Sequence, residues 1–312
     1  MRVMATGLVL ALAWFAAVNA CASILSWMLA TSLSSPSQRE KPRLLLAIRL
    51  FPAIVSIVFA GVLFVPSHWA LEPRDANETL GLVWYGLACA GLLLLIRSTA
   101  RALAIVRTDR QLRLAERPST VSVADVYEAD GLRGVSLAGV FRTRILIGPS
   151  VARQLSPAEL EVAVAHELAH QHAFDNLARW SILCAPAFFC GCRAARRLEQ
   201  DWHAAAESLA DARAVRGDSV RAVHLASALV KVARLAAEGP ADLRVPTWST
   251  LNDPPLLERR VRRLVTGQVP VATRAHSRIL PAIAIGAALL IAIPTSAGPV
   301  HRLTETLVSL LP

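Results

Sequence analysis

The residues best suited to chemistry in this sequence are two histidines and a glutamate within Ser156–His172, in the segment His166-Glu167-Leu168-Ala169-His170. On a helix, residues four positions apart lie on one face, so both imidazoles can bind a single metal ion. Glu167 lies one position round, where its carboxylate can reach a water beside that ion. This spacing is typical of tetrahedral zinc with a neighbouring general base. The alternative is an alanine-rich helix whose histidines simply face solvent or a core.

The same stretch carries the signals of the helix that this spacing requires. Ser156 and Glu159 have the spacing of a capping box, and Pro157 suits a first helical turn. Alanine, leucine and glutamate, which favour helices, fill the interior. We therefore predict a helix over Ser156–His172.

A catalytic zinc needs a third protein ligand and an open fourth position. Leu198–Arg216 is predicted to be a second helix, with Glu207 and Asp211 four positions apart on one face. Glu207 is the expected third ligand of one Zn²⁺ per chain, and Asp211 is expected to hold a ligand imidazole from behind. Helix geometry alone leaves Asp201 and His203 as other candidate ligands. An exposed, salt-bridged helix face is the structural alternative.

The composition indicates a membrane protein. Hydrophobic residues make up 54% of the 312 residues, charged residues only 18%, and the mean hydropathy is +0.45. That is too apolar for an ordinary soluble domain. Arginines beside membrane spans account for the net charge of +10, and without a nucleic-acid-binding motif we expect no nucleic-acid partner. Four stretches are long enough to span a bilayer: Val3–Pro36, Leu44–Pro66, Thr79–Ile96 and Ile279–Ala297.

Two details of these stretches have alternative interpretations. Val18-Asn19-Ala20-Cys21 faintly resembles a lipoprotein cleavage site, but Asn19 is unusual there and the apolar run continues past Cys21. We therefore expect the first span to be retained. Arg49, near one end of the second span, is expected to extend its guanidinium to the membrane interface.

The charges between the spans predict the topology. Arg39, Lys41 and Arg43 lie in the first connection, whereas the second, Ser67–Glu78, is acidic. Five arginines follow the third span, at positions 97, 101, 107, 110 and 113. By the positive-inside rule the N-terminus is outside and the region after the third span is cytosolic. We predict three spans in residues 1–96, a cytosolic domain carrying the zinc motif in residues 97–277, and a fourth transmembrane helix with a short outer tail in residues 278–312.

Hydrophobic periodicity predicts a mainly α integral membrane protein with a small α+β cytosolic domain. Helix is expected to about Ala115, followed by a strand over Thr120–Glu128 and a second strand or hairpin at Arg144–Ile147. Helices dominate afterwards, including Ser219–Ala237.

The uncharged stretch Trp180–Cys192 is too short for another span. A crossing there would also place His166 and His170 on the opposite side of the membrane from Glu207. We expect a core or membrane-dipping segment near the site. Three cysteines follow or lie within it, Cys184, Cys190 and Cys192. In a reducing cytosol they are expected to be packing thiols, with a second metal site as the alternative.

With these residues in place, the chain resembles the membrane-embedded zinc metallopeptidases of the gluzincin type. His166–His170, followed by Asp175-Asn176, and Glu207–Asp211 match the H-E-x-x-H and E-x-x-x-D motifs of that group. Val140–Ile147 resembles the strand before the motif helix in the antirepressor peptidases, the beta-lactam sensor-transducer family, which also have three spans, a cytosolic zinc domain and a fourth span. Asp253–Arg259 instead resembles the H-P-P-L-L-E-R segment of the HtpX-like and CAAX prenyl proteases.

Two departures from these families matter. In the second group, a histidine before Pro-Pro is implied to act near the substrate oxyanion, and here that residue is Asp253. An ionised carboxylate cannot donate a hydrogen bond, so His203 and His224 become candidates, with plain helix-surface histidines as the alternative. Only Gly298–Pro312 follows the fourth predicted span, so we expect no external drug-sensing domain of the kind found in the full beta-lactam sensors.

The resemblance implies an endopeptidase at the cytosolic membrane face, with His166, His170 and Glu207 binding zinc and Glu167 as general base. An extended polypeptide substrate, from a cytosolic or a membrane protein, is expected to bind at a strand edge near Val140–Ile147. Regulated proteolysis of a transcriptional repressor is one hypothesis, and quality control of membrane proteins is another. A non-catalytic zincin-fold receptor or a plain membrane scaffold are the alternatives without enzymatic activity. The intact Glu167 argues against the receptor.

Overall fold

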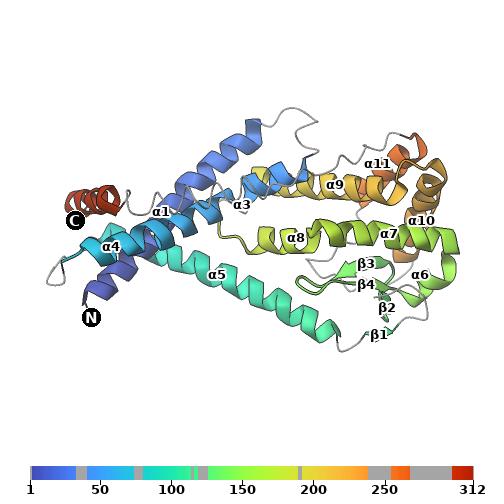
Figure 1. The fold of residues 1–312 in the computed structure, drawn as a ribbon, viewed down its shortest axis with the longest axis horizontal. Helices are drawn as coiled ribbons and strands as arrows, with labels where there is room; N and C mark the ends of the chain where they lie inside the picture. Colours follow the sequence, from blue (N-terminus) through green and yellow to red (C-terminus); the bar gives the residue numbers. More distant parts are fainter. Residues whose placement is uncertain are drawn as a thin grey trace.

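The computed structural model describes residues 2–32, 41–73, 80–113, 116–118, 126–188, 192–237, 254–267 and 297–311. Long helices from the first 113 residues occupy one end of the molecule, and shorter helices with a small sheet occupy the other (Figure 1). A C-terminal helix, residues 297–310, lies at the end formed by the long helices. The described chain is therefore mainly helical, in agreement with the predicted class.

Three helical segments are long and apolar enough to cross a membrane: Val3–Ser32, Pro42–Leu71 and Leu82–Gln111. They belong to α1 (Arg2–Ser32), to α3 (Pro42–Val58) continued through the π-helical η1 (Phe59–Phe64) and α4 (Val65–Leu71), and to α5 (Leu82–Arg113). Each of the first three predicted spans overlaps one of these segments, although the third segment continues to Gln111, well past the predicted end at Ile96. The fourth, Ile279–Ala297, falls almost entirely outside the described residues.

The outer faces of these helices are apolar. Leu82 is 87% exposed, Trp69 74% and Leu93 66%. On the inner side, Trp14 and Trp84 pack together with buried Phe64. A helix that is hydrophobic all round suits an apolar surrounding rather than water.

The sheet has four strands in the order β1-β2-β4-β3: β1 (Arg117–Pro118), β2 (Val126–Glu128), β4 (Arg144–Ile147) and β3 (Val135–Ala138). β4 is parallel to β2 and forms an antiparallel hairpin with β3. The predicted strand at Arg144–Ile147 and its hairpin are therefore confirmed. Of the predicted strand over Thr120–Glu128, the residues before Val126 lie outside the described part of the chain.

This strand order corrects the predicted substrate edge. The segment Val140–Ile147 was expected to present a free edge, but β4 is paired on both sides. The hairpin places β3 outside β4, so among the described strands the sheet edge next to the helices is Val135–Ala138. Residues 139–143 form only the hairpin turn.

The remaining helices are α6 (Pro149–Gln154), α7 (Pro157–Ala173), α8 (Asp175–Cys184), α9 (Arg193–Val215), α10 (Ser219–Ala237) and α11 (Pro254–Val265). α7 and α10 confirm the helices predicted over Ser156–His172 and Ser219–Ala237. α9 confirms the helix predicted over Leu198–Arg216, but it starts at Arg193. Leu137, Ile145 and Ile147 of the sheet form one core with apolar residues of α7 and α10.

α9 packs directly on the apolar helix α3. Leu45 and Ile48 of α3 share a buried cluster with Leu198 and Trp202 of α9. Arg49 lies at this seam and is only 6% exposed, with Nε donating to Glu199 Oε1 at 2.8 Å. Arg49 is therefore packed against α9 and paired with the partly exposed Glu199 rather than extended into open solvent.

The described part of Trp180–Cys192 contains buried residues, among them Ile182 and Cys184, whereas Phe188 is 37% exposed. Ile182 joins the α3–α9 cluster, and Cys184 packs with Ile105 and Val140. Cys192 caps α9, with Sγ accepting from the backbone N–H of Ala195 at 3.4 Å. The described cysteines are free thiols. Cys190 lies outside the described residues, so a second metal site there stays untested.

Candidate metal centre

α7 and α9 lie side by side and bring the three predicted ligands together (Figure 1). The Nε2 atoms of His166 and His170 are 3.1 Å apart, and each lies 3.4 Å from a carboxylate oxygen of Glu207. Tetrahedral ligands about 2.0–2.1 Å from a zinc ion lie about 3.3 Å from one another. His166 Nε2 approaches Glu207 Oε2 and His170 Nε2 approaches Glu207 Oε1, and one ligand atom from each residue lies within 4.8 Å of the others, which is close enough to surround one ion.

Local interactions at both ends define the helix that carries the histidines. At the start of α7, Ser156 and Glu159 form the predicted capping box, with Ser156 N donating to Glu159 Oε2 at 2.8 Å. The same carboxylate accepts from Lys231 and Ser227 of α10. At the other end, Phe174 adopts a left-handed conformation with φ 58°, which turns the chain directly into α8.

Both imidazoles are held from behind by carboxylates. His170 Nδ1 lies 2.7 Å from Asp175 Oδ2, and His166 Nδ1 lies 3.0 Å from Asp211 Oδ1. The hydrogen bond to Asp175 favours a proton on Nδ1 of His170, whereas the His166–Asp211 contact is close but lacks hydrogen-bond geometry. Both Nε2 atoms face Glu207. The position of Asp211 agrees with its predicted role. Asp175 was quoted only as part of a motif; the turn at Phe174 brings it back beside His170.

Glu167 faces the same centre from the side of the sheet. Its Oε2 accepts from the backbone N–H of Leu137 in β3 at 2.8 Å, whereas Oε1 is buried without a hydrogen-bond partner among the described residues. Burial raises the pKa of Glu167 to about 7, although the neighbouring histidines oppose the rise. A carboxylate with a free oxygen and a pKa near neutrality is suited to accept a proton.

Arg260 of α11 is the site residue that sequence reasoning missed. It is 6% exposed, and its guanidinium lies 2.8 Å from Glu207 Oε2 and 2.6 Å from Asp211 Oδ1. A signal for it was present, since it directly follows the Asp253–Arg259 segment with its family resemblance. Nothing in the sequence, however, indicated whether Arg259, Arg260 or a later arginine of this helix turns inward.

These charges shift one another's protonation. Burial alone would raise the pKa values of Glu207 and Asp211, but Arg260 and the neighbouring histidines together lower both, Glu207 well below its usual range. Burial would lower the pKa of His170, yet Glu207 and Asp175 raise it to about 10. Metal binding at these imidazoles must therefore displace a proton.

The donor set fits a zinc ion. Two imidazoles and one carboxylate are a known catalytic zinc set. Glu167 directly follows His166 in the chain, and its Oε1 is buried without a hydrogen-bond partner among the described residues. His166 and Glu167 are 0% exposed, His170 1% and Glu207 2%, so the centre is enclosed. Removing charged groups from water in this way strengthens every interaction among them.

The other predicted candidates lie further out. His203 Nδ1 is 3.9 Å from Glu207 Oε1, and its side chain is 19% exposed. Asp201 lines a cavity at the first turns of α9 with Arg193 and Trp27. His224 is a partly exposed residue of α10. Asp253 lies outside the described residues, so no residue is assigned to the substrate oxyanion.

Comparison with known proteins does not identify the chain. The sequence matches no protein-family model, and no curated protein matches it in a sequence search. The class of protein must therefore be argued from the geometry of the centre and from the motifs.

Proposed function

We propose that this chain is an integral-membrane zinc endopeptidase of the gluzincin type. One observation carries the proposal: two imidazoles and a carboxylate, mutually 3.1–3.4 Å apart, lie in the same helix pair as a buried glutamate with an unpartnered oxygen. A structural ion-pair network has no need of that free oxygen. Hydrolysis does, because the attacking water must lose a proton.

In this mechanism His166, His170 and Glu207 hold the ion, and Asp211 and Asp175 keep the two imidazoles oriented. A zinc ion held there would act as a Lewis acid on the peptide carbonyl and the attacking water. Glu167 Oε1 takes the proton of the water, and the same carboxylate returns it to the leaving amine. The N–H of Leu137 holds Oε2, so the free oxygen keeps one orientation.

Substrate access requires movement. The candidate ligands are enclosed, and part of the β3 edge beside them is already hydrogen-bonded: Leu137 N donates to Glu167, and Asn176 Nδ2 donates to the carbonyls of Leu137 and, in the turn after β3, of Gly139, both at 2.8 Å. A peptide that pairs with β3 must displace the Asn176 contacts or bind beyond them. We therefore propose that opening of α8 from β3 precedes binding of an extended substrate.

The decisive experiment is Glu167→Gln, which preserves shape and removes the proton acceptor. We expect zinc content to stay near one per chain while proteolysis falls by about 10²–10⁴-fold. Glu161→Gln is the matched control, since Glu161 lies on the same helix with its side chain 69% exposed. Near-normal cleavage by zinc-loaded Glu167→Gln would remove Glu167 from the mechanism.

The cellular location is part of the proposal. The arginine-rich connections place the N-terminus outside and the metal centre in the cytosol of a multi-pass membrane protein. Reporters fused after Asp75 and Pro312 should signal from outside, and one fused near Gly239 from the cytosol. An external signal at Gly239 would contradict the topology.

The substrate is a polypeptide, and repressor cleavage competes with quality control of membrane proteins. The four-span arrangement favours the first, and the segment at residues 254–259 favours the second. Mapping new protein N-termini in cells with wild-type protein and with Glu167→Gln separates them. One or two soluble targets indicate regulated proteolysis, whereas many membrane targets indicate quality control.

A further inference from the structure

The seam between α1, α3 and α9 contains a buried arginine whose hydrogen bonding is incomplete. Arg49 uses Nε for Glu199 and donates from Nη2 to the carbonyl of Ile182 at 2.9 Å. Its Nη1 is buried without a hydrogen-bond partner among the described residues. Buried polar groups normally have partners, so Nη1 points to a missing acceptor.

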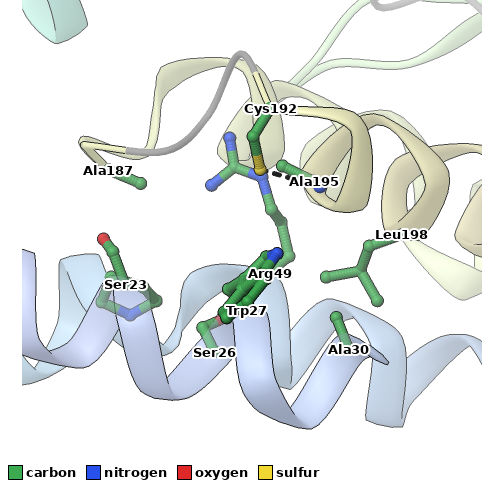
Figure 2. Close-up of a pocket in the computed structure, with 10 residues that line it drawn as sticks. Ser23, Ser26, Trp27, Ala30, Arg49, Ala187, Cys192, Ala195 and Leu198 are labelled. Carbon is green, nitrogen blue, oxygen red and sulfur yellow. Dashed lines mark hydrogen bonds between the residues drawn. The ribbon is translucent and has the colours of Figure 1, made fainter. Parts of the chain in front are cut away.

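A cavity adjoins this arginine. Figure 2 shows the guanidinium of Arg49 between α1, which carries Ser23 and Trp27, and the start of α9, which carries Ala195 and Leu198. The volume of this cavity is about 30 Å³, room for one water-sized group such as a single phosphate oxygen.

A larger cavity continues from it along α9. Its volume is about 340 Å³, and it shares Trp27 and Leu198 with the first. Arg193 and Arg197 line it, with Asp201 as its acidic residue. We call the two cavities together the α1–α9 groove. Three arginines and one aspartate line the groove, and both Arg193 and Arg197 are exposed.

The groove lies where apolar surface meets charge. The last turns of α1 expose Trp27, 49%, and Met28, 53%, and the first turn of α9 follows with its arginines. Tryptophan is enriched at membrane–water interfaces, and basic pockets between transmembrane helices on the cytoplasmic side bind anionic lipid headgroups.

We propose that the α1–α9 groove binds the phosphate of an anionic glycerophospholipid from the cytosolic leaflet. One phosphate oxygen accepts from Arg49 Nη1, and Arg193 and Arg197 neutralise the rest of the headgroup. The inference rests on the proposed membrane orientation and is independent of protease activity. Its consequence is mechanical: the lipid fastens α1 and α3 to α9, the helix that carries Glu207.

The test uses the full-length, delipidated protein in neutral detergent. Thermal stability and native mass spectra are recorded with phosphatidylglycerol, phosphatidylcholine, or inorganic phosphate. We expect phosphatidylglycerol alone to raise the Tm and to remain bound at one molecule per chain. Arg193→Gln/Arg197→Gln should weaken this binding about tenfold or more, because each charge-assisted hydrogen bond that is lost contributes substantially to the binding free energy. Arg107→Gln/Arg153→Gln, which removes two exposed arginines elsewhere, should leave it unchanged.

A second variant tests Arg49 without altering net charge. Arg49→Gln/Glu199→Gln removes both partners of the ion pair and should also lose the retained lipid. Equal effects of both phospholipids, or of inorganic phosphate, would overturn the proposal, as would equal losses in the control variant. No Tm shift in the wild type would mean that only water fills the groove.

Discussion

The two ends of this molecule place apolar and charged side chains in opposite ways. The long helices expose leucines and tryptophans and bury other apolar residues, whereas the candidate metal centre buries three carboxyl groups and one guanidinium almost completely, those of Glu167, Glu207, Asp211 and Arg260. At one end the apolar exterior demands an apolar surrounding. At the other, apolar walls surround charges that only one another, or an ion, can compensate.

This difference indicates which substitutions each end tolerates. Exposed leucines of the apolar helices can change with little effect on a site elsewhere. At the metal centre, loss of one charge leaves its partners buried and unpaired, which costs more than the pair itself contributes. The predictions below, from the largest effect to the smallest, probe how sharply the buried charges depend on one another.

Loss of Glu207 should have the largest effect. Glu207→Ala removes the proposed third ligand and leaves Arg260 facing two histidines, so tight zinc binding and activity should disappear together. His203→Ala, one turn earlier on the same helix and 3.9 Å from the Glu207 carboxylate, should retain zinc. Zinc analysis of both purified variants decides. Zinc lost in His203→Ala and kept in Glu207→Ala would transfer the ligand role to His203.

Arg260→Gln should expose the electrostatic role of α11. It leaves Glu207 and Asp211 without their buried cation, so we expect the zinc-free protein to lose about 3–5 kcal/mol of stability. Zinc supplies positive charge to Glu207, so the loss should be smaller in the zinc-loaded protein. Melting curves with and without zinc measure the difference. Arg259→Gln, the exposed neighbour, is the control, and equal losses in both variants would contradict the role of Arg260.

Glu159→Gln should have the smallest effect, because it lies outside the metal centre. Loss of the capping interactions should cost about 0.5–2 kcal/mol at pH 7. Burial would raise the pKa of Glu159, but Lys231, Ser227 and the N–H of Ser156 lower it from 4.5 to about 2. A lowered pKa stabilises the fold above about pH 4.5 and loses that contribution as the pH falls toward 2. The Tm difference from the wild type should therefore shrink below pH 4.5, whereas exposed Glu161→Gln should show little difference at any pH.

Local signals predicted the elements and several site residues. The capping box located the start of α7, and the four-residue spacings placed His166, His170, Glu207 and Asp211 on faces that do meet. Local signals failed where a residue's partner is distant in sequence. Arg49 was predicted to reach the interface, but the sequence did not indicate its partner Glu199, 150 residues later. The order of the strands likewise depends on how the hairpin packs into the sheet. The sequence therefore predicted the substrate-binding edge at β4, whereas the structure has β3 at the edge.

By itself, the sequence determined which residues can act as ligands and base, because helical periodicity relates positions three and four apart without reference to the rest of the chain. It also determined the apolar segments, since their length and composition are local properties. Only the tertiary structure decided that Arg260 faces Glu207 and Asp211, that Leu137 holds one oxygen of Glu167, and that Asp175 returns to His170. Each depends on how separate elements pack, and packing energy is shared among many residues distant in sequence.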